Sequence, residues 1–125
     1  MIELQRYQRW FAAAALYNLC WGSVVMVAAS SLAWQVVGMF VLVYAPAYWW
    51  IARYPERHAH LAAIALLGKI LGPLGLLASV TLGRASPSLA WVVLTNDVLL
   101  WPAFGSYLRE AAQLHGGWRV FLSGA

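Results

Sequence analysis

Apolar residues along this chain fall into four long runs that are separated by short polar stretches. The four runs cover residues 10–29, 32–52, 61–82 and 89–108. Each is about 20 residues long, which is the length that an α-helix needs to cross the hydrocarbon core of a bilayer. The first two runs are divided only by Ser30 and Ser31, so a tight turn is expected there. The pattern predicts an all-α fold, a four-transmembrane-helix bundle that forms one domain over residues 1–125.

Strands are disfavoured because backbone groups in lipid must be hydrogen-bonded within their own segment, and strands achieve this only in a closed barrel. Composition leads to the same class: 63% of the residues are hydrophobic and 10% are charged. Soluble domains average about 45–50% and about 25% respectively. After the fourth run, residues 111–125 predict a short interfacial tail. We therefore expect an integral, multi-pass protein of the cell membrane.

Basic residues predict which side of the membrane each loop faces. With a cytoplasmic N-terminus, Arg84 lies outside and the other arginines lie inside, namely Arg6, Arg9, Arg53, Arg57, Arg109 and Arg119. This distribution follows the positive-inside tendency and predicts that both termini are cytoplasmic. The same bias disfavours dual topology, so a homodimer would be parallel. The net charge of +4 then reflects topology and attraction to anionic membrane lipid, and we expect no nucleic-acid partner.

Two opposite charges, Lys69 and Asp97, interrupt the third and fourth runs near their centres. A single charge at that depth costs about 2.5–3.5 kcal/mol on insertion scales, so it requires a partner or a function. The two helices run in opposite directions, which places the two residues within about 5 Å of each other in depth. The sequence therefore predicts a Lys69–Asp97 ion pair. Burial favours the neutral forms and mutual attraction the charged forms, so the protonation state stays open.

Other polar residues fall at a similar depth and could satisfy the remaining valences of the pair. Two tryptophans lie deeper in their runs than the interfacial aromatic residues, and we expect them to line the same site. The candidate ligand-binding residues are Lys69, Asp97, Asn96, Asn18, Tyr44, Trp21 and Trp101. Together they predict one polar layer near the bilayer midplane.

Prolines near this layer are expected to free backbone carbonyls, because a helical proline removes the hydrogen bond to the residue four positions earlier. Pro73 would free the carbonyl of Lys69, and Pro102 would free that of Val98. Prolines are also common in membrane helices without any site, so a purely structural role remains equally open.

Small residues recur every three or four positions on the third run, at Gly68, Gly72, Gly75 and Ser79. Such a stripe allows a neighbouring backbone to approach closely. We expect this helix to be central, and its glycines are candidates for contact with a membrane protein partner or a second copy of the chain.

Conventional catalytic and metal-binding patterns are missing from the sequence. His58 and His60 diverge at a spacing of two on a helix, and Cys20 has no second cysteine to pair with. We therefore predict no metal site, no cofactor and no catalytic residues. An intramembrane enzyme with Asp97 as acid or base ranks last, because one carboxylate and one lysine do not specify a reaction.

The segments around the two charges resemble those of a group of small bacterial four-helix integral membrane proteins. The similar strings are Gly-Lys-Ile-Leu-Gly-Pro at residues 68–73 and Thr-Asn-Asp-Val-Leu-Leu-Trp-Pro-Ala-Phe at residues 95–104. The resemblance implies the four-helix fold and a location in the bacterial inner membrane, but it implies no reaction. Small multidrug exporters of this size carry a carboxylate in the first helix, where this chain has Asn18.

Two functions follow as expectations. The first is binding or transport of a small amphipathic or lipid-like molecule at the Lys69–Asp97 site. The alternative is a noncatalytic structural or assembly subunit, in which the pair fixes helix packing and the glycine stripe contacts the partner.

Overall fold

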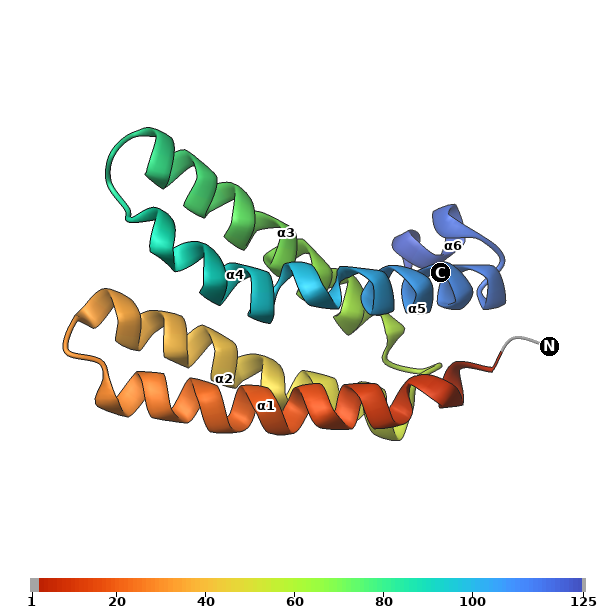
Figure 1. Ribbon diagram of the computed structural model, residues 1–125. Helices are drawn as coiled ribbons and strands as arrows, with labels where there is room; N and C mark the ends of the chain where they lie inside the picture. The colour runs from red at the N-terminus through yellow and green to blue at the C-terminus, as the bar shows by residue number, and fades with distance from the viewer. Residues whose placement is uncertain (1–2, 125) are drawn as a thin grey trace. The chain divides into compact units, whose positions relative to one another are not determined.

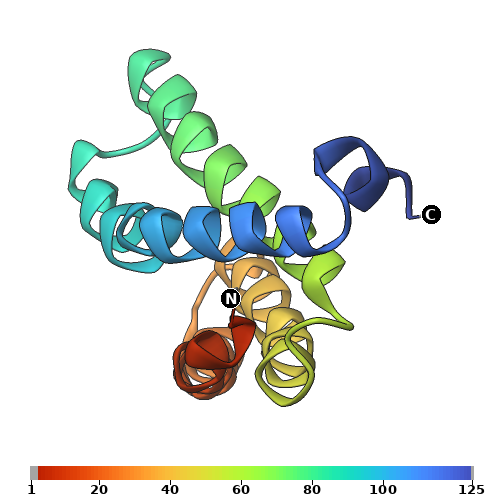
Figure 2. The same cartoon turned by 90° about the vertical axis from the view of Figure 1, so that its right-hand side faces the viewer.

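The computed structural model describes residues 3–124, and these residues form helices joined by short turns, with no strand among them. The all-α prediction is therefore confirmed. Residues up to Ala62 form one compact unit, and residues from Ala63 onward form a second. Figures 1 and 2 show the helices of each unit from two directions. Ala125, at the end of the predicted tail, lies outside the described residues.

The first unit is a hairpin of two antiparallel helices, α1 (Gln8–Ala28) and α2 (Leu32–Arg53), preceded by a short 3₁₀ helix, η1 (Leu4–Tyr7). The turn falls at the two serines, as predicted. The Ser31 side chain accepts a hydrogen bond from the Trp34 backbone N–H at 3.4 Å and thereby caps the start of α2. The Gln35 amide donates to the Ala29 carbonyl at 3.0 Å and satisfies the end of α1.

Two buried glycines bring α1 and α2 into backbone contact. A Cβ atom added at Gly22 would lie 2.6 Å from the Leu42 backbone nitrogen and 2.9 Å from the Gly38 carbonyl oxygen. A Cβ atom at Gly38 would collide with the backbone of Met26 in the same way. Glycine is required at both positions because any side chain would separate the helices. Close packing was predicted on the third helix, and this crossing was not predicted.

Helix α3 runs from Ala59 to Thr81, and its first turn belongs to the first unit. The predicted boundaries of the first three helices lie within two residues of those of α1, α2 and α3. The fourth predicted helix differs, because it is interrupted at Asp97. It consists of η2 (Pro87–Leu89), α4 (Ala90–Asn96), η3 (Val98–Leu100) and α5 (Trp101–Leu114).

The chain ends in a short helix, α6 (Trp118–Ser123), that packs against the end of α5. Gly116 and Gly117 adopt φ angles of 82° and 107°, which side-chain-bearing residues rarely adopt, and they reverse the chain between the two helices. The buried Phe121 ring then lies 5.6 Å from the His115 ring. Helix α5 thus continues past the predicted end at Leu108, and the predicted tail is largely helical.

Four segments of the structure are long and apolar enough to cross a membrane: Leu4–Ala28, Leu32–Arg53, Ala59–Thr81 and Pro87–Leu114. Many of their large apolar side chains stay more than half exposed, for example Leu16, Val27, Phe40, Leu71 and Leu99. Soluble proteins rarely expose contiguous apolar surface of this extent, since water would drive it into a core. Such exposure is expected of helices that are long and apolar enough to cross a membrane.

Candidate functional site

The interruption at Asp97 leaves a backbone carbonyl without its helical donor. In a continuous helix the Leu100 N–H would bond to the carbonyl of Asn96. Here it bonds instead to the Asp97 carbonyl at 3.1 Å, in the tighter 3₁₀ pattern. The Thr95 hydroxyl also donates back to the Trp91 carbonyl at 2.8 Å, a contact that favours bending of a helix. The Asn96 carbonyl is therefore available to another donor.

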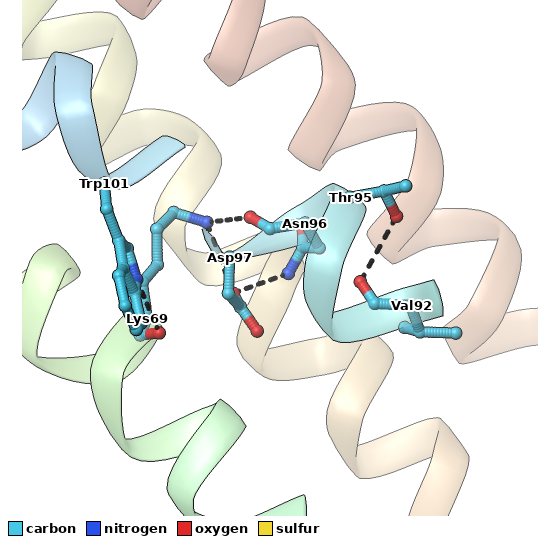
Figure 3. Close-up of polar contacts among 6 residues, drawn as sticks. All are labelled: Lys69, Val92, Thr95, Asn96, Asp97 and Trp101. Atoms are coloured by element: carbon cyan, nitrogen blue, oxygen red, sulfur yellow. Dashed lines mark hydrogen bonds and ion pairs between the residues drawn. The ribbon is translucent and has the colours of Figure 1, made fainter. Parts of the chain in front are cut away.

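Lys69 of α3 supplies that donor. Its Nζ donates to the Asn96 carbonyl oxygen at 2.7 Å and lies 3.5 Å from Oδ1 of Asp97 (Figure 3). The carbonyls at the end of a helix carry partial negative charge, so the end of α4 and the carboxylate both stabilise the ammonium group. The Phe104 ring of α5 lies 5.9 Å from Nζ, within the range of a cation–π contact. Lys69 is only 5% exposed, so these contacts replace water almost completely.

Asp97 is held by two neighbours on one oxygen and approaches a glycine with the other. The Asn96 side-chain amide donates to Oδ1 at 3.1 Å. A Cβ atom added at Gly72 of α3 would lie 2.9 Å from Oδ2. Gly72 therefore makes room for the carboxylate, a function inside the second unit that the sequence analysis did not assign to it.

A second contact between α3 and the interrupted segment uses the Lys69 backbone. The Trp101 indole N–H donates to the Lys69 carbonyl oxygen at 3.1 Å. This carbonyl is the one that Pro73 was predicted to free, and the indole supplies the missing donor. Lys69 thus contacts both sides of the interruption, α4 through its ammonium group and the start of α5 through its carbonyl.

The second proline prediction was wrong. Pro102 lies in the first turn of α5, where a proline is tolerated because the first N–H groups of a helix have no intrahelical partner. The Val98 carbonyl is not free, since it accepts the Trp101 backbone N–H in the 3₁₀ segment. Interruption of the helix before Pro102 removes the conflict that a continuous helix would create.

The structure joins four of the predicted site residues in the second unit: Lys69, Asp97, Asn96 and Trp101. The predicted ion pair is confirmed. Phe104 was missed, although its position one helical turn after Trp101 was a usable signal.

Three other candidates belong to the first unit, and their membership of the same layer stays a prediction. Asn18 is 3% exposed, and its Oδ1 accepts no hydrogen bond from the described residues. Tyr44 is half-buried, with its ring centroid 5.9 Å from that of Tyr48. Trp21 is also half-buried.

Two acceptor atoms at the interruption have no hydrogen-bond donor within residues 3–124. Oδ2 of Asp97 accepts no hydrogen bond, and neither does the buried Oδ1 of Asn96. A buried acceptor without a donor costs about 1–3 kcal/mol. The arrangement can therefore receive additional N–H or O–H donors.

Trp101→Phe is expected to lower the free energy of unfolding by about 1–3 kcal/mol, because the Lys69 carbonyl would lose the indole donor. Pro73→Ala restores a backbone N–H at the position that normally bonds to this carbonyl. Trp101→Phe should therefore cost clearly less in the Pro73→Ala background. Unfolding by sodium dodecyl sulfate in mixed micelles, followed by circular dichroism, measures all four members of the cycle. An equal cost in both backgrounds would show that the indole contact is not what stabilises this carbonyl.

Fold and site together define a helical protein with four segments able to cross a membrane and a buried ion pair at a helix interruption. Comparisons with protein-family models, with curated proteins and with solved structures found no match for this chain.

Proposed function

We propose that this chain is a multi-pass membrane protein whose four helical segments cross the bilayer with both termini in the cytoplasm. The exposed apolar side chains of the four segments support membrane insertion. The excess of arginines in the segments assigned to the cytoplasmic side supports this orientation. Exposed Trp49, Trp50 and Tyr54 near the end of α2 suit a membrane interface. The resemblance of residues 68–73 and 95–104 to a group of small bacterial membrane proteins favours the bacterial inner membrane.

The protein binds or transports a small amphipathic or lipid-like molecule at the helix interruption, through a head group that carries N–H donors. The observation that carries this proposal is a pair of acceptors without a donor, Oδ2 of Asp97 and Oδ1 of Asn96. They lie beside Lys69, whose ammonium group already contacts the Asn96 carbonyl and Oδ1 of Asp97. A charged or polar residue in a membrane helix is retained when a partner or a ligand compensates its cost. Lys69 compensates one carboxylate oxygen, and a ligand amine would compensate the second.

Asp97→Asn is expected to weaken binding of a dansyl-labelled long-chain amine by about tenfold or more, since a charge-assisted hydrogen bond is replaced by a neutral one. The variant keeps the side-chain volume, so an effect on shape is excluded. Fluorescence titration of proteoliposomes measures the binding, and release of the preloaded amine measures transport. Glu3→Gln removes an exposed carboxylate elsewhere and serves as the matched control. Unchanged binding and release by folded Asp97→Asn protein would disprove the proposal.

An assembly subunit remains the second candidate function, and the observation that favours it is the open surface beside Gly75. A Cβ atom added there would meet nothing within 4 Å, in contrast to one at Gly72. Gly75 is therefore available to the backbone of a partner helix, such as that of a second copy of the chain. In this case Gly75→Leu would remove a co-purifying partner. Neither the parent nor Asp97→Asn would bind the labelled amine.

A further inference from the structure

We propose that the α1–α2 hairpin holds a single anionic phospholipid, with its phosphate in a basic pocket and one acyl chain in an adjoining apolar groove. This site shares no residue with the Lys69–Asp97 site. It rests on the membrane location proposed above, but not on amine binding at Asp97.

The head-group pocket lies where the start of the first helix meets the turn between α2 and α3. It has a volume of about 290 Å³, and its lining residues are Gln5, Gln8, Arg53, Tyr54, Pro55, Glu56 and Arg57. Guanidinium groups bind phosphate oxygens with paired hydrogen bonds, and glutamine amides can donate further ones. Two arginines against one glutamate leave positive charge in excess, which favours an anionic head group over a zwitterionic one.

The acyl-chain groove lies between α1 and α2 and has a volume of about 350 Å³. Its lining side chains are all apolar, and Ala12, Leu16 and Leu19 of α1 face Pro46 and Trp49 of α2 across it. Three of its lining residues are strongly exposed: Leu16 by 62%, Leu19 by 50% and Trp49 by 51%. An open apolar groove of this kind suits a flexible hydrocarbon chain, which gains dispersion contacts at the helix surface.

Helical spacing aligns the pocket and the groove along the hairpin. Gln5, Gln8, Ala12, Leu16 and Leu19 succeed one another at intervals of three or four residues, so they lie on one face of the first helix. On α2, which runs in the opposite direction, the same order is given by Arg53, Trp49 and Pro46.

A direct contact joins the two cavities at the level of α2. The Arg53 guanidinium carbon lies 6.0 Å from the centroid of the Trp49 ring. Arg53 lines the pocket and Trp49 lines the groove, so the polar part of the site passes directly into the apolar part. A phospholipid has the same sequence of parts, with a charged head group followed by an acyl chain.

Native mass spectrometry of the full chain in dodecyl maltoside micelles tests the proposal, with phosphatidylglycerol and phosphatidylcholine as probes. Phosphatidylglycerol should bind at least about tenfold more tightly than phosphatidylcholine. Arg53→Gln/Arg57→Gln should lower its affinity by a further tenfold or more, consistent with the loss of charge-assisted hydrogen bonds. Arg109→Gln/Arg119→Gln removes the same charge from exposed positions of α5 and α6 and should change the affinity less than threefold.

Two further variants and one control test each part of the site without removing an arginine. Ala12→Phe fills the groove and should weaken phosphatidylglycerol binding, whereas Ala13→Phe adds the same ring at an exposed neighbouring position and should not. Glu56→Gln removes the negative charge from the pocket and should tighten binding. Circular dichroism confirms that each variant is folded.

Three outcomes would overturn the proposal. Equal affinity for the two lipids would show that the arginines do not select an anionic head group. Equal losses in both arginine double variants would leave only unspecific charge attraction. Displacement of the lipid by millimolar inorganic phosphate, together with unchanged phosphatidylglycerol affinity of Ala12→Phe, would identify a site for free phosphate. Tighter binding of phosphatidylethanolamine, weakened by Glu56→Gln, would identify a zwitterionic head group.

Discussion

Gly38→Ala is expected to destabilise the α1–α2 hairpin by about 3 kcal/mol, at the upper end of the range for overpacked positions. The added Cβ would collide with the Met26 backbone and lie 2.9 Å from the Gly22 carbonyl oxygen. Backbone atoms within a helix cannot rotate away as a flexible side chain can, so the two helices must separate. Separation would also open the helix–helix contact on both sides of the crossing. Gly22→Ala should have a similar effect, because its Cβ would meet the Leu42 backbone.

Gly105→Ala in α5 provides the matched control for this prediction. A Cβ atom added at Gly105 would meet nothing within 4 Å, so the same substitution introduces no collision. Alanine is favoured over glycine in a helix by about 1 kcal/mol, and this variant should be slightly more stable than the parent. Midpoints of unfolding by sodium dodecyl sulfate, measured by circular dichroism, compare the three variants. Equal midpoints for Gly38→Ala and Gly105→Ala would contradict the close crossing.

Lys69→Met is expected to lower the free energy of unfolding by about 3–5 kcal/mol, the cost of removing one partner from a buried ion pair. Asp97 would lose its cationic partner, and the Asn96 carbonyl would lose its donor. Asp97→Leu should cost a similar amount because it leaves the ammonium group with only one oxygen acceptor. The double variant should be more stable than either single variant, since an apolar pair leaves no unpaired charge.

The same unfolding titration of the parent, both single variants and the double variant yields the coupling energy of the pair. A coupling energy near zero would show that the two charges do not stabilise each other, although they lie 3.5 Å apart. Glu3→Gln again serves as a control for the loss of one exposed carboxylate.

The four long helical segments were predictable because each one is encoded by its own run of apolar residues. Segment length and composition decide whether a helix can cross a membrane, and both are local properties of the chain. The interruption of the fourth helix at Asp97 was not predictable in this way. Neither Asp97 nor Thr95 prevents a helix, and the contact that accompanies the interruption comes from Lys69, which is distant in the sequence.

The two charged residues of the candidate site were found from the sequence because charge inside an apolar segment is costly. Lys69 and Asp97 were predicted to pair in this way, and the structure confirms the pair. Asn96 and Trp101 were found from their depth in the apolar runs, whereas Phe104 and Gly72 gave no comparable signal. Phe104 and Gly72 contribute through the position of a ring and through the lack of a side chain, and these roles exist only once two helices lie together.

The sequence by itself determined the all-α class, the four apolar segments, the turn at Ser30 and Ser31 and the pairing of two opposite charges. Only the tertiary structure decided which atoms satisfy that pair and where the helices touch. The Lys69 carbonyl illustrates the difference: Pro73 predicts that it lacks a helical donor, while the identity of the donor, the Trp101 indole, depends on the approach of another segment. Local patterns fix which groups need partners, and three-dimensional proximity fixes which partners they obtain.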